Sequence, residues 1–243
     1  MVIPGVNKVR EEFAYKFIND RFIGEKGRRT LELAPATFEA DRDYILGEVN
    51  EDYVKRELAW YESQSLNVND IPGGPPEVWK RAATPEGFIN SNYGWVVFSK
   101  ENGSQYQNAL RELERDPDSR RAVMIYTRPS MHVDQNTGGM QDFMCTNTVQ
   151  YFIRNGLLVT HVSMRSNDAY FGYRNDRAWQ KHVTSKLAAD LSVPVGATYW
   201  TVGSLHFYER HFYLVEAYAS KNRTKITASE HAELFPDSQW RVK

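Results

Sequence analysis

The stretch "MQDFMCTNTVQYFIRNGLLVTHVSMRSNDAYFGYRNDRAWQ", residues 140–180, decides how the centre of the fold is predicted. Two runs rich in β-branched and aromatic residues flank an Asn-Gly dipeptide at 155–156, the strongest short-range signal for a two-residue β-hairpin turn. A hairpin closed by that turn places Cys145 opposite Ser166 and next to Arg165 across the ladder. A β-bulge would shift this register by one residue without separating the two ends.

Cys145 is the only cysteine of the chain, so it has no partner for an intrachain disulfide or a zinc site. Free cysteines are commonly buried and inert, which makes a structural role the first interpretation. A neighbouring guanidinium changes this, because a cation lowers the pKa of a thiol and favours the reactive thiolate. Arg165 would also suit bidentate binding of an anionic substrate. The predicted register therefore favours a nucleophile at Cys145.

The rest of the chain predicts an α+β fold in which helices flank a mixed or antiparallel sheet. Apolar residues at helical spacing indicate helices near residues 9–17 and 53–61 and a third that ends near 116–117. No repeat or linker divides the 243 residues, so a single domain, 1–243, is expected. Further expected elements are bent strand segments in "RTLELAPATFEAD", an irregular segment at 68–95, a strand at 121–128, a helix around 176–191, a strand around 197–205 and a helix beginning near Glu209.

Composition excludes several functional classes. The 30 Lys and Arg residues nearly balance the 31 Asp and Glu residues, so nothing draws the whole chain to nucleic acid or to an anionic membrane. Any anion site must be a local cluster of arginines. No apolar run approaches the roughly 20 residues that span a bilayer, and no secretory signal begins the chain, so a cytoplasmic protein is expected. No zinc-protease helix motif or nucleotide-binding Gly-rich loop is present, and no metal is assigned.

Several separated motifs resemble the thymidylate synthase superfamily in order and spacing. They are "DPDSRR" at 116–121, Cys145, "RSND" at 165–168 with Gly172, and "GSLHFY" at 203–208. Within that superfamily the chain is similar to the phage deoxycytidylate hydroxymethylases, through "INSNYGW", "MIYTRPSM", "DFMCTNTVQY", "MRSND", "YRND" and "VGSLHFY". The resemblance covers nearly the whole chain and implies a thymidylate synthase-like fold, a homodimer and the use of folate.

The resemblance implies a role for each matching residue. Cys145 matches the nucleophile that attacks carbon 6 of the pyrimidine, which makes carbon 5 nucleophilic. The one-carbon unit would come from 5,10-methylenetetrahydrofolate. Arg165 and Ser166 match phosphate ligands of the same subunit, and Arg120 and Arg121 match arginines that reach the phosphate from the partner subunit. Without the resemblance, the last two would be a solvated turn after a helix.

Four further residues match the family, each beside a plainer alternative. His206 and Tyr208 match residues that hold the sugar hydroxyl, although a half-buried strand with alternating polar groups would look the same. Glu57 in "RELAWY" matches the glutamate that organises water and proton transfer, although alone it would be a surface helix residue. Tyr93 in "NYG" matches an active-site tyrosine, and aromatic packing is its alternative.

Three more residues are assigned to substrate binding. Asn167 and Asp168 complete the "RSND" motif. Lys26 lies in "GEKGRRT", where the match to a phosphate-binding segment is inexact. Which of Lys26, Arg28 and Arg29 reaches the substrate is left open.

Asp176 departs from the thymidylate synthase pattern, which has at this position an asparagine that reads uracil. A carboxylate can accept from the amino group of cytosine and from its protonated ring nitrogen. Protonation would also draw electrons from carbon 6 and ease thiolate attack. Asp176 is thus expected to serve both recognition and catalysis. The alternative is an aspartate that stabilises a helix N-terminus.

The predicted activity is conversion of dCMP to 5-hydroxymethyl-dCMP with 5,10-methylenetetrahydrofolate and water. Thr146, where many thymidylate synthases have histidine, also suits an altered pyrimidine. Transfer of hydride instead of water would make 5-methyl-dCMP, and a change around the sugar would admit CMP. From another class, a non-catalytic nucleotide- or RNA-binding protein remains an alternative. The intact set of Cys145, Arg165, Asp176 and His206 argues against it. An enzyme of a phage would act in the cytoplasm of its bacterial host.

Overall fold

The computed structural model describes residues 2–240, which fall into two compact units. The first unit contains residues 2–49, 164–181 and 197–240, and the second contains 50–163 and 182–196. Three elements contribute residues to both units. They are β5 (Leu157–Asp168), α7 (Phe171–Asp190) and β6 (Val195–Tyr208).

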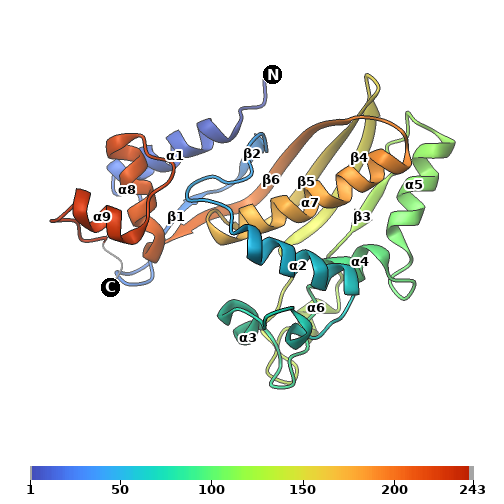
Figure 1. The fold of residues 1–243 in the computed structure, drawn as a ribbon, viewed down its shortest axis with the longest axis horizontal. Coiled ribbons are helices and arrows are strands. Elements are labelled where there is room, and N and C mark those ends of the chain that lie inside the picture. The colour runs from blue at the N-terminus through green and yellow to red at the C-terminus, as the bar shows by residue number, and fades with distance from the viewer. Residues whose placement is uncertain (1, 241–243) are drawn as a thin grey trace. The chain divides into compact units, whose positions relative to one another are not determined.

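The predicted hairpin is present. β4 (Thr146–Arg154) and β5 are joined by Asn155 and Gly156, whose φ angles of 53° and 75° are both positive, as a type I′ turn requires. Counting β1 (Thr30–Leu33), β2 (Ala36–Glu39) and β3 (Val123–Ile125), the strands are hydrogen-bonded in the order β1-β6-β5-β4-β3, and β2 also pairs with β6. The α+β prediction, with helices beside an antiparallel sheet, is confirmed (Figure 1).

In the first unit, helices pack on the strand pairs that β6 makes with β1 and β2. Leu31 of β1 pairs with Phe207, and Phe38 of β2 pairs with Trp200. The two strand segments predicted on either side of Pro35 therefore both pair with β6 in antiparallel orientation. The ring of Phe13 meets that of Phe207 edge-on at 4.8 Å. The helices of this unit, besides its part of α7, are α1 (Val6–Ile18), the 3-10 turn η2 (Glu209–His211), α8 (Phe212–Lys221) and α9 (Ala228–Leu234).

In the second unit, β3 and β4 form a sheet edge with one buried face. Met124 pairs with Val149 and both are fully buried, whereas Ile125 on the other face is 55% exposed. That alternation is the period of a half-buried strand. The helices of this unit, besides its part of α7, are α2 (Glu51–Ser63), the 3-10 turn η1 (Val68–Asp70), α3 (Glu77–Ala82), α4 (Tyr93–Phe98), α5 (Gln105–Arg115) and α6 (Met131–Asp134).

Helix α7 begins at Phe171, five residues before the expected start. The Oδ1 of Asp168 accepts a hydrogen bond from the backbone N–H of Tyr170 at 2.8 Å, so the chain turns directly out of β5. The dipole of a helix acts most strongly on a carboxylate in the first turn. Asp176 is the sixth residue of α7 and therefore lies beyond that turn. The helix-terminus interpretation of Asp176 loses its physical basis.

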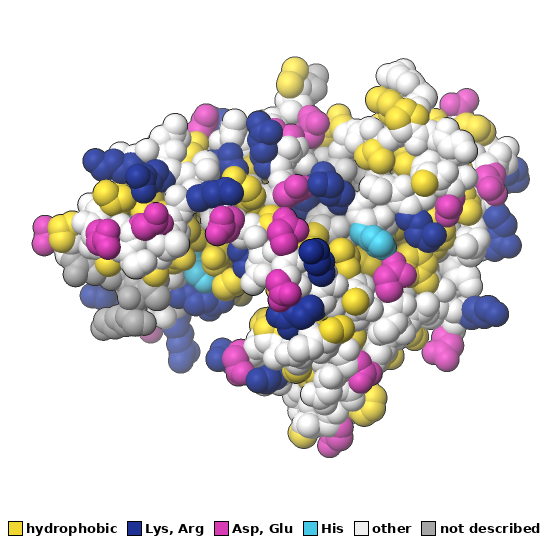
Figure 2. Space-filling view, viewed as in Figure 1, with side chains coloured by type: hydrophobic (Ala, Val, Ile, Leu, Met, Phe, Trp, Pro, Cys, Tyr) yellow, Lys and Arg dark blue, Asp and Glu magenta, His cyan; other side chains and the backbone are white. Residues whose placement is uncertain are grey.

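The charges on the face shown in Figure 2 are interspersed by sign, in keeping with the near-balance of acidic and basic residues. Helix α7 is not apolar enough to cross a membrane, nor is any other helix in residues 2–240.

Candidate active site

The residues predicted to act together lie in both units. The second unit contains Glu57, Tyr93, Arg120, Arg121 and Cys145, and the first contains Lys26, Arg165, Ser166, Asn167, Asp168, Asp176, His206 and Tyr208.

Cys145 directly precedes β4 and is half-buried. The next residue, Thr146, is fully buried and donates a hydrogen bond from its hydroxyl to the Tyr93 hydroxyl at 3.0 Å. Thr146 thus bonds the cysteine segment to the predicted active-site tyrosine. The pairing of Cys145 with Ser166 stays a prediction.

Tyr93 lies in the first turn of α4 and is fixed by its packing. Its ring stacks on that of Tyr61 in α2 at 5.3 Å. Asn92 caps α4 by accepting from the Trp95 N–H at 2.7 Å, and its amide donates to the carbonyl of Trp60 at 3.0 Å. A Cβ on Gly94 would lie 1.7 Å from the Tyr61 carbonyl oxygen, so only glycine fits there. The segment that carries Tyr93 is therefore tightly joined to α2.

Glu57 is a buried carboxyl on the same helix α2, only 5% exposed. Its Oε1 accepts hydrogen bonds from the Tyr53 hydroxyl at 2.6 Å and the Trp79 indole N–H at 3.1 Å. Burial raises the pKa of Glu57, and these two hydrogen bonds only partly oppose the rise. A carboxyl with a raised pKa, fixed by two donors, is suited to exchange protons with a bound water. The surface-helix alternative for Glu57 is wrong.

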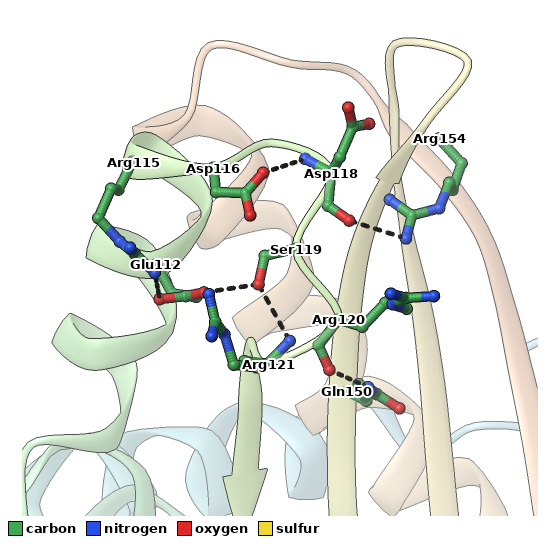
Figure 3. Close-up of polar contacts among 9 residues, drawn as sticks. All are labelled: Glu112, Arg115, Asp116, Asp118, Ser119, Arg120, Arg121, Gln150 and Arg154. Carbon is green, nitrogen blue, oxygen red and sulfur yellow. Dashed lines mark hydrogen bonds and ion pairs between the residues drawn. The ribbon is translucent and has the colours of Figure 1, made fainter.

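The arginine loop, residues 116–121, follows α5 (Figure 3). Glu112 accepts from the Ser119 hydroxyl and from Arg115 Nη2, each at 2.6 Å, and from Arg121 Nε at 3.0 Å. The pKa of Glu112 is lowered to about 2, mainly by the hydrogen bonds from Ser119 and Arg115. Arg120 is exposed, and its carbonyl accepts from the Gln150 amide at 2.7 Å. Both arginine side chains are thus exposed, on a loop whose Ser119 is buried and bonded to Glu112.

The "RSND" motif ends β5, and exposure differs among its residues. Arg165 is exposed, whereas Asn167 is only 2% exposed. The side-chain amide nitrogen of Asn167 donates to Oδ2 of Asp176 at 2.7 Å. The side-chain oxygen of Asn167, Oδ1, is buried without a hydrogen-bond partner among residues 2–240. The structure thus brings together two of the predicted residues and leaves a buried acceptor beside them.

His206 and Tyr208 lie on the same side of β6 with their rings edge-on at 4.8 Å. His206 is buried, and its Nδ1 lies 3.4 Å from both the carbonyl and the hydroxyl oxygen of Ser204. Tyr208 is 37% exposed. This is the arrangement of a ring fixed beside an accessible hydroxyl, which suits binding of a polar ligand group.

The three basic residues near the N-terminus differ in their contacts. Arg29 donates to Glu209 from Nη2 at 2.7 Å and from Nε at 3.1 Å, and its guanidinium lies 4.6 Å from the centre of the Trp240 ring. Lys26 and Arg28 are exposed. Arg29 therefore has a structural partner within the first unit, which leaves Lys26 and Arg28 as the solvent-facing cations.

Sequence reasoning missed Asp142, a buried acidic residue three positions before Cys145. Asp142 directly precedes the apolar run Phe143, Met144 and Cys145, and no local pattern links it to the polar run Asn90, Ser91 and Asn92 ahead of Tyr93. In residues 2–240, no group of three or more His, Cys, Asp or Glu side chains is placed to hold a metal ion.

The chain was compared with known proteins. The family model described as thymidylate synthase matches residues 47–234. The chain is 49% identical over 219 residues to the deoxycytidylate 5-hydroxymethyltransferases of Enterobacteria phages T4 and T6, covering 87% of this chain and 89% of each relative. It is 24% identical over 178 residues to a thymidylate synthase of Francisella tularensis subsp. holarctica, covering 69% of this chain and 65% of that protein.

A solved structure shares the fold. The thermostable thymidylate synthase A of Bacillus subtilis superposes with a TM-score of 0.68 at 20% identity, covering 89% of this chain and 83% of that one. Together with the match over residues 47–234, these findings place the chain in a known group: it belongs to the thymidylate synthase family.

Proposed function

We propose that this protein is a deoxycytidylate 5-hydroxymethyltransferase, which converts dCMP, 5,10-methylenetetrahydrofolate and water to 5-hydroxymethyl-dCMP and tetrahydrofolate. The observation that carries the proposal is the 49% identity over most of both chains to phage proteins of that name. The bonded pair of Asn167 and Asp176 supports cytosine as the base, because a carboxylate replaces the asparagine expected of a uracil-reading enzyme.

Cys145 is the proposed nucleophile. Its thiolate adds to carbon 6 of the cytosine ring, and the electron pair released toward carbon 5 makes that atom nucleophilic. Support comes from the fixed position of its neighbour Thr146 on Tyr93. A nucleophile gains most from neighbours that hold it near the attack geometry before the substrate arrives.

Asp176 is the proposed base-reading residue. Its carboxylate accepts from the exocyclic amino group and from the protonated ring nitrogen of cytosine, in a charge-assisted pair. Asn167 donates to Oδ2 of Asp176 at 2.7 Å and so orients the carboxylate.

The folate co-substrate fits the residues present. Asp168 is a half-buried carboxylate whose Oδ1 accepts from Tyr170, and an oxygen acceptor of this kind suits the N–H donors at the edge of a pterin ring. Asp168 is the residue that would hold that edge. Bound folate supplies the one-carbon unit that carbon 5 takes up.

Glu57 is the proposed proton carrier for the water that completes the hydroxymethyl group. Its raised pKa lets the carboxyl take a proton from water and return it within the buried site. Tyr53 and Trp79 hold the carboxyl in place while the proton moves.

The phosphate is the proposed partner of the arginines, shared between two subunits of a homodimer. Arg165 and Ser166 would bind it within one subunit, and Arg120 and Arg121 would come from the other. Val123 and Ile125 are apolar residues exposed on the outward face of β3, which a contact with a second subunit would cover. Lys26 is the proposed further cation for the phosphate, since Arg29 is bonded to Glu209.

We propose that residues 1–243 act as one catalytic domain, because the family match over 47–234 includes residues of both compact units. The relatives from phages support action in the cytoplasm of an infected bacterium.

Mass analysis of the reaction product tests the function. With dCMP and 5,10-methylenetetrahydrofolate, we expect 5-hydroxymethyl-dCMP and tetrahydrofolate. A methylated nucleotide with dihydrofolate would replace the proposal by a methyltransferase. Faster turnover of CMP than of dCMP would replace it by a ribonucleotide enzyme, and nucleotide binding without turnover would favour a binding protein.

Subunit mixing tests the shared arginines. Arg121→Ala and Cys145→Ser proteins should each have little activity alone. After subunit exchange, one site of a mixed dimer pairs an intact Cys145 with an intact Arg121, so activity should return. An active wild-type protein that sediments as a monomer would contradict the shared site.

A further inference from the structure

Asp142 binds the segment that leads into α4 with both of its carboxylate oxygens. Its Oδ2 accepts from the backbone N–H groups of Asn90 at 2.8 Å and Ser91 at 2.7 Å, and its Oδ1 accepts from the Ser91 hydroxyl at 2.7 Å. Asp142 is 7% exposed. Burial raises the pKa of Asp142, and the three donors and the nearby charge of Arg128 oppose that rise only in part.

This contact fixes one side of Cys145, and the contact of Thr146 with Tyr93 fixes the other. Asp142 lies three residues before the cysteine and Thr146 one residue after it. Both bond to the same short segment, residues 90–93. The cysteine is thus held between two attachments to a single support.

The support is itself firmly placed. Asn92 donates to the carbonyls of Trp60 at 3.0 Å and Ser65 at 2.9 Å. Gly94 packs directly on the backbone of α2. Since α2 also carries Glu57, the attachments of Asp142 set the cysteine segment against the helix of the proposed proton carrier.

The backbone alone would not hold Cys145. Residues 140–145 lie outside the helices and strands, and β4 begins only at Thr146. Besides the backbone hydrogen bond from Gln141 to the Ala82 carbonyl at 2.8 Å and the burial of Met144, the side-chain hydrogen bonds of Asp142 and Thr146 position this part of the chain. A thiol that attacks a ring carbon needs an accurate approach, and a displacement of about 1 Å at a reacting group can lower a rate about 10²-fold.

We propose that Asp142 is a positioning residue for the Cys145 thiol, acting through its bonds to Asn90 and Ser91. The inference rests on the proposed function insofar as the thiol is the nucleophile. Asp142 does not touch the substrate. Its removal is expected to lower the rate of the chemical step and to leave nucleotide binding in place.

The first test replaces Asp142 with asparagine, which keeps the size of the side chain but removes its charge and reverses the hydrogen bond with the Ser91 hydroxyl, since the amide NH2 can only donate. In the Asp142→Asn protein, kcat should fall about 10²-fold while the Kd for dCMP changes less than about threefold. The matched control is Asp134→Asn in α6. The Asp134 carboxylate makes no hydrogen bond or ion pair within residues 2–240, so this variant should leave kcat and the Kd for dCMP unchanged. Equal losses of kcat and of dCMP binding in Asp142→Asn would overturn the proposal in favour of a general structural role.

The second test needs neither dCMP nor folate. Because Cys145 is the only cysteine, its alkylation by iodoacetamide reports its own accessibility. At alkaline pH, where the thiol is ionised in every variant, the alkylation rate of Asp142→Asn should rise about fivefold as the segment loosens, and that of Asp134→Asn should not change. An unchanged alkylation rate in folded Asp142→Asn would overturn the proposal.

Ser91→Ala serves if Asp142→Asn does not fold, since it removes one of the three hydrogen bonds and leaves the two backbone donors. We expect about a twofold rise in alkylation and about a fivefold fall in kcat. Wild-type values for both would overturn the proposal. The two proposals can fail separately. If the wild type does not turn over dCMP but the variants are alkylated faster, the proposed function is refuted and the positioning role is supported.

Discussion

The cysteine segment, residues 140–146, and the arginine loop, residues 116–121, belong to the same unit but are held in opposite ways. Around the cysteine, buried groups such as Asp142 and Thr146 bond to one support. Around the loop, hydrogen bonds converge on Glu112 from Arg115, which is 63% exposed, and Arg121, which is 71% exposed. Buried hydrogen bonds are expensive to break, whereas exposed ion pairs are weak and screened by salt. The difference suggests that the chemical step depends on a rigid segment and that phosphate binding tolerates a more adaptable one.

The largest effect should follow from removing the nucleophile. Cys145→Ser should lower kcat on the order of 10³-fold or more, because a hydroxyl is a much weaker nucleophile than a thiolate. Nucleotide binding, measured by calorimetry, should remain. Loss of turnover with intact binding would show that the cysteine segment serves the chemical step and not nucleotide binding. Full activity of the serine variant would show that the cysteine is structural.

A comparable loss is expected at Glu57. Glu57→Gln keeps both hydrogen bonds to the carbonyl oxygen but cannot exchange a proton, so kcat should fall about 10²-fold to 10³-fold. Glu51→Gln, in the first turn of the same helix, is the matched control. Turnover at the wild-type rate in the Glu57 variant would exclude proton transfer by this residue.

The same variant should alter stability in the opposite direction. Burial raises the pKa of Glu57 above its ordinary value of 4.5, so ionisation destabilises the folded state as the pH rises through the raised pKa. Glu57→Gln should therefore be more stable than the wild type at about pH 8, and the advantage should disappear below about pH 4. Urea unfolding at several pH values measures this. A constant difference across the range would mean that the carboxyl is not perturbed.

The next effect concerns base choice in the first unit. Asp176→Asn should lose dCMP turnover and gain dUMP turnover, shifting the ratio of the two kcat/KM values by about tenfold to a hundredfold, since a charge-assisted hydrogen bond is lost. Asp237→Asn, an exposed carboxylate of the same unit, should leave the ratio unchanged. An unchanged ratio in folded Asp176→Asn would remove the main structural reason for cytosine.

The smallest effect is expected in the arginine loop. Glu112→Gln should raise KM for dCMP about threefold with little change in kcat, because Arg121 loses a weak, exposed partner. Glu114→Gln on the same helix is the control. Since Glu112 has its pKa lowered to about 2, any stabilisation it gives is present at neutral pH and is lost as the pH falls from about 4.5 to about 2. A large fall in kcat would erase the contrast between loop and segment.

Much of the fold followed from local signals. The Asn-Gly dipeptide predicted the hairpin because both turn residues need positive φ, and Pro35 predicted the break between β1 and β2. The short helices α3 and α4 were hidden in a Gly- and Pro-rich segment, since they are stabilised by contacts such as that of Gly94 with Tyr61 rather than by periodicity.

The candidate residues followed from motif resemblance, but their environments did not. Glu57 has the sequence context of a surface helix, and only the packing of Tyr53 and Trp79 makes it a buried carboxyl. Asp142 was missed because its partners lie about fifty positions earlier in the chain, beyond the reach of any local pattern.

Gly94 also limits how this sequence can change over time. With Tyr61 carbonyl oxygen 1.7 Å from any added Cβ, even alanine would force α2 and α4 apart. An exposed position can accept many residues by neutral substitution, whereas position 94 accepts no residue with a Cβ. In a library with codon 94 randomised, selection for a functional gene should return glycine codons alone, whichever nucleotide the survivors modify.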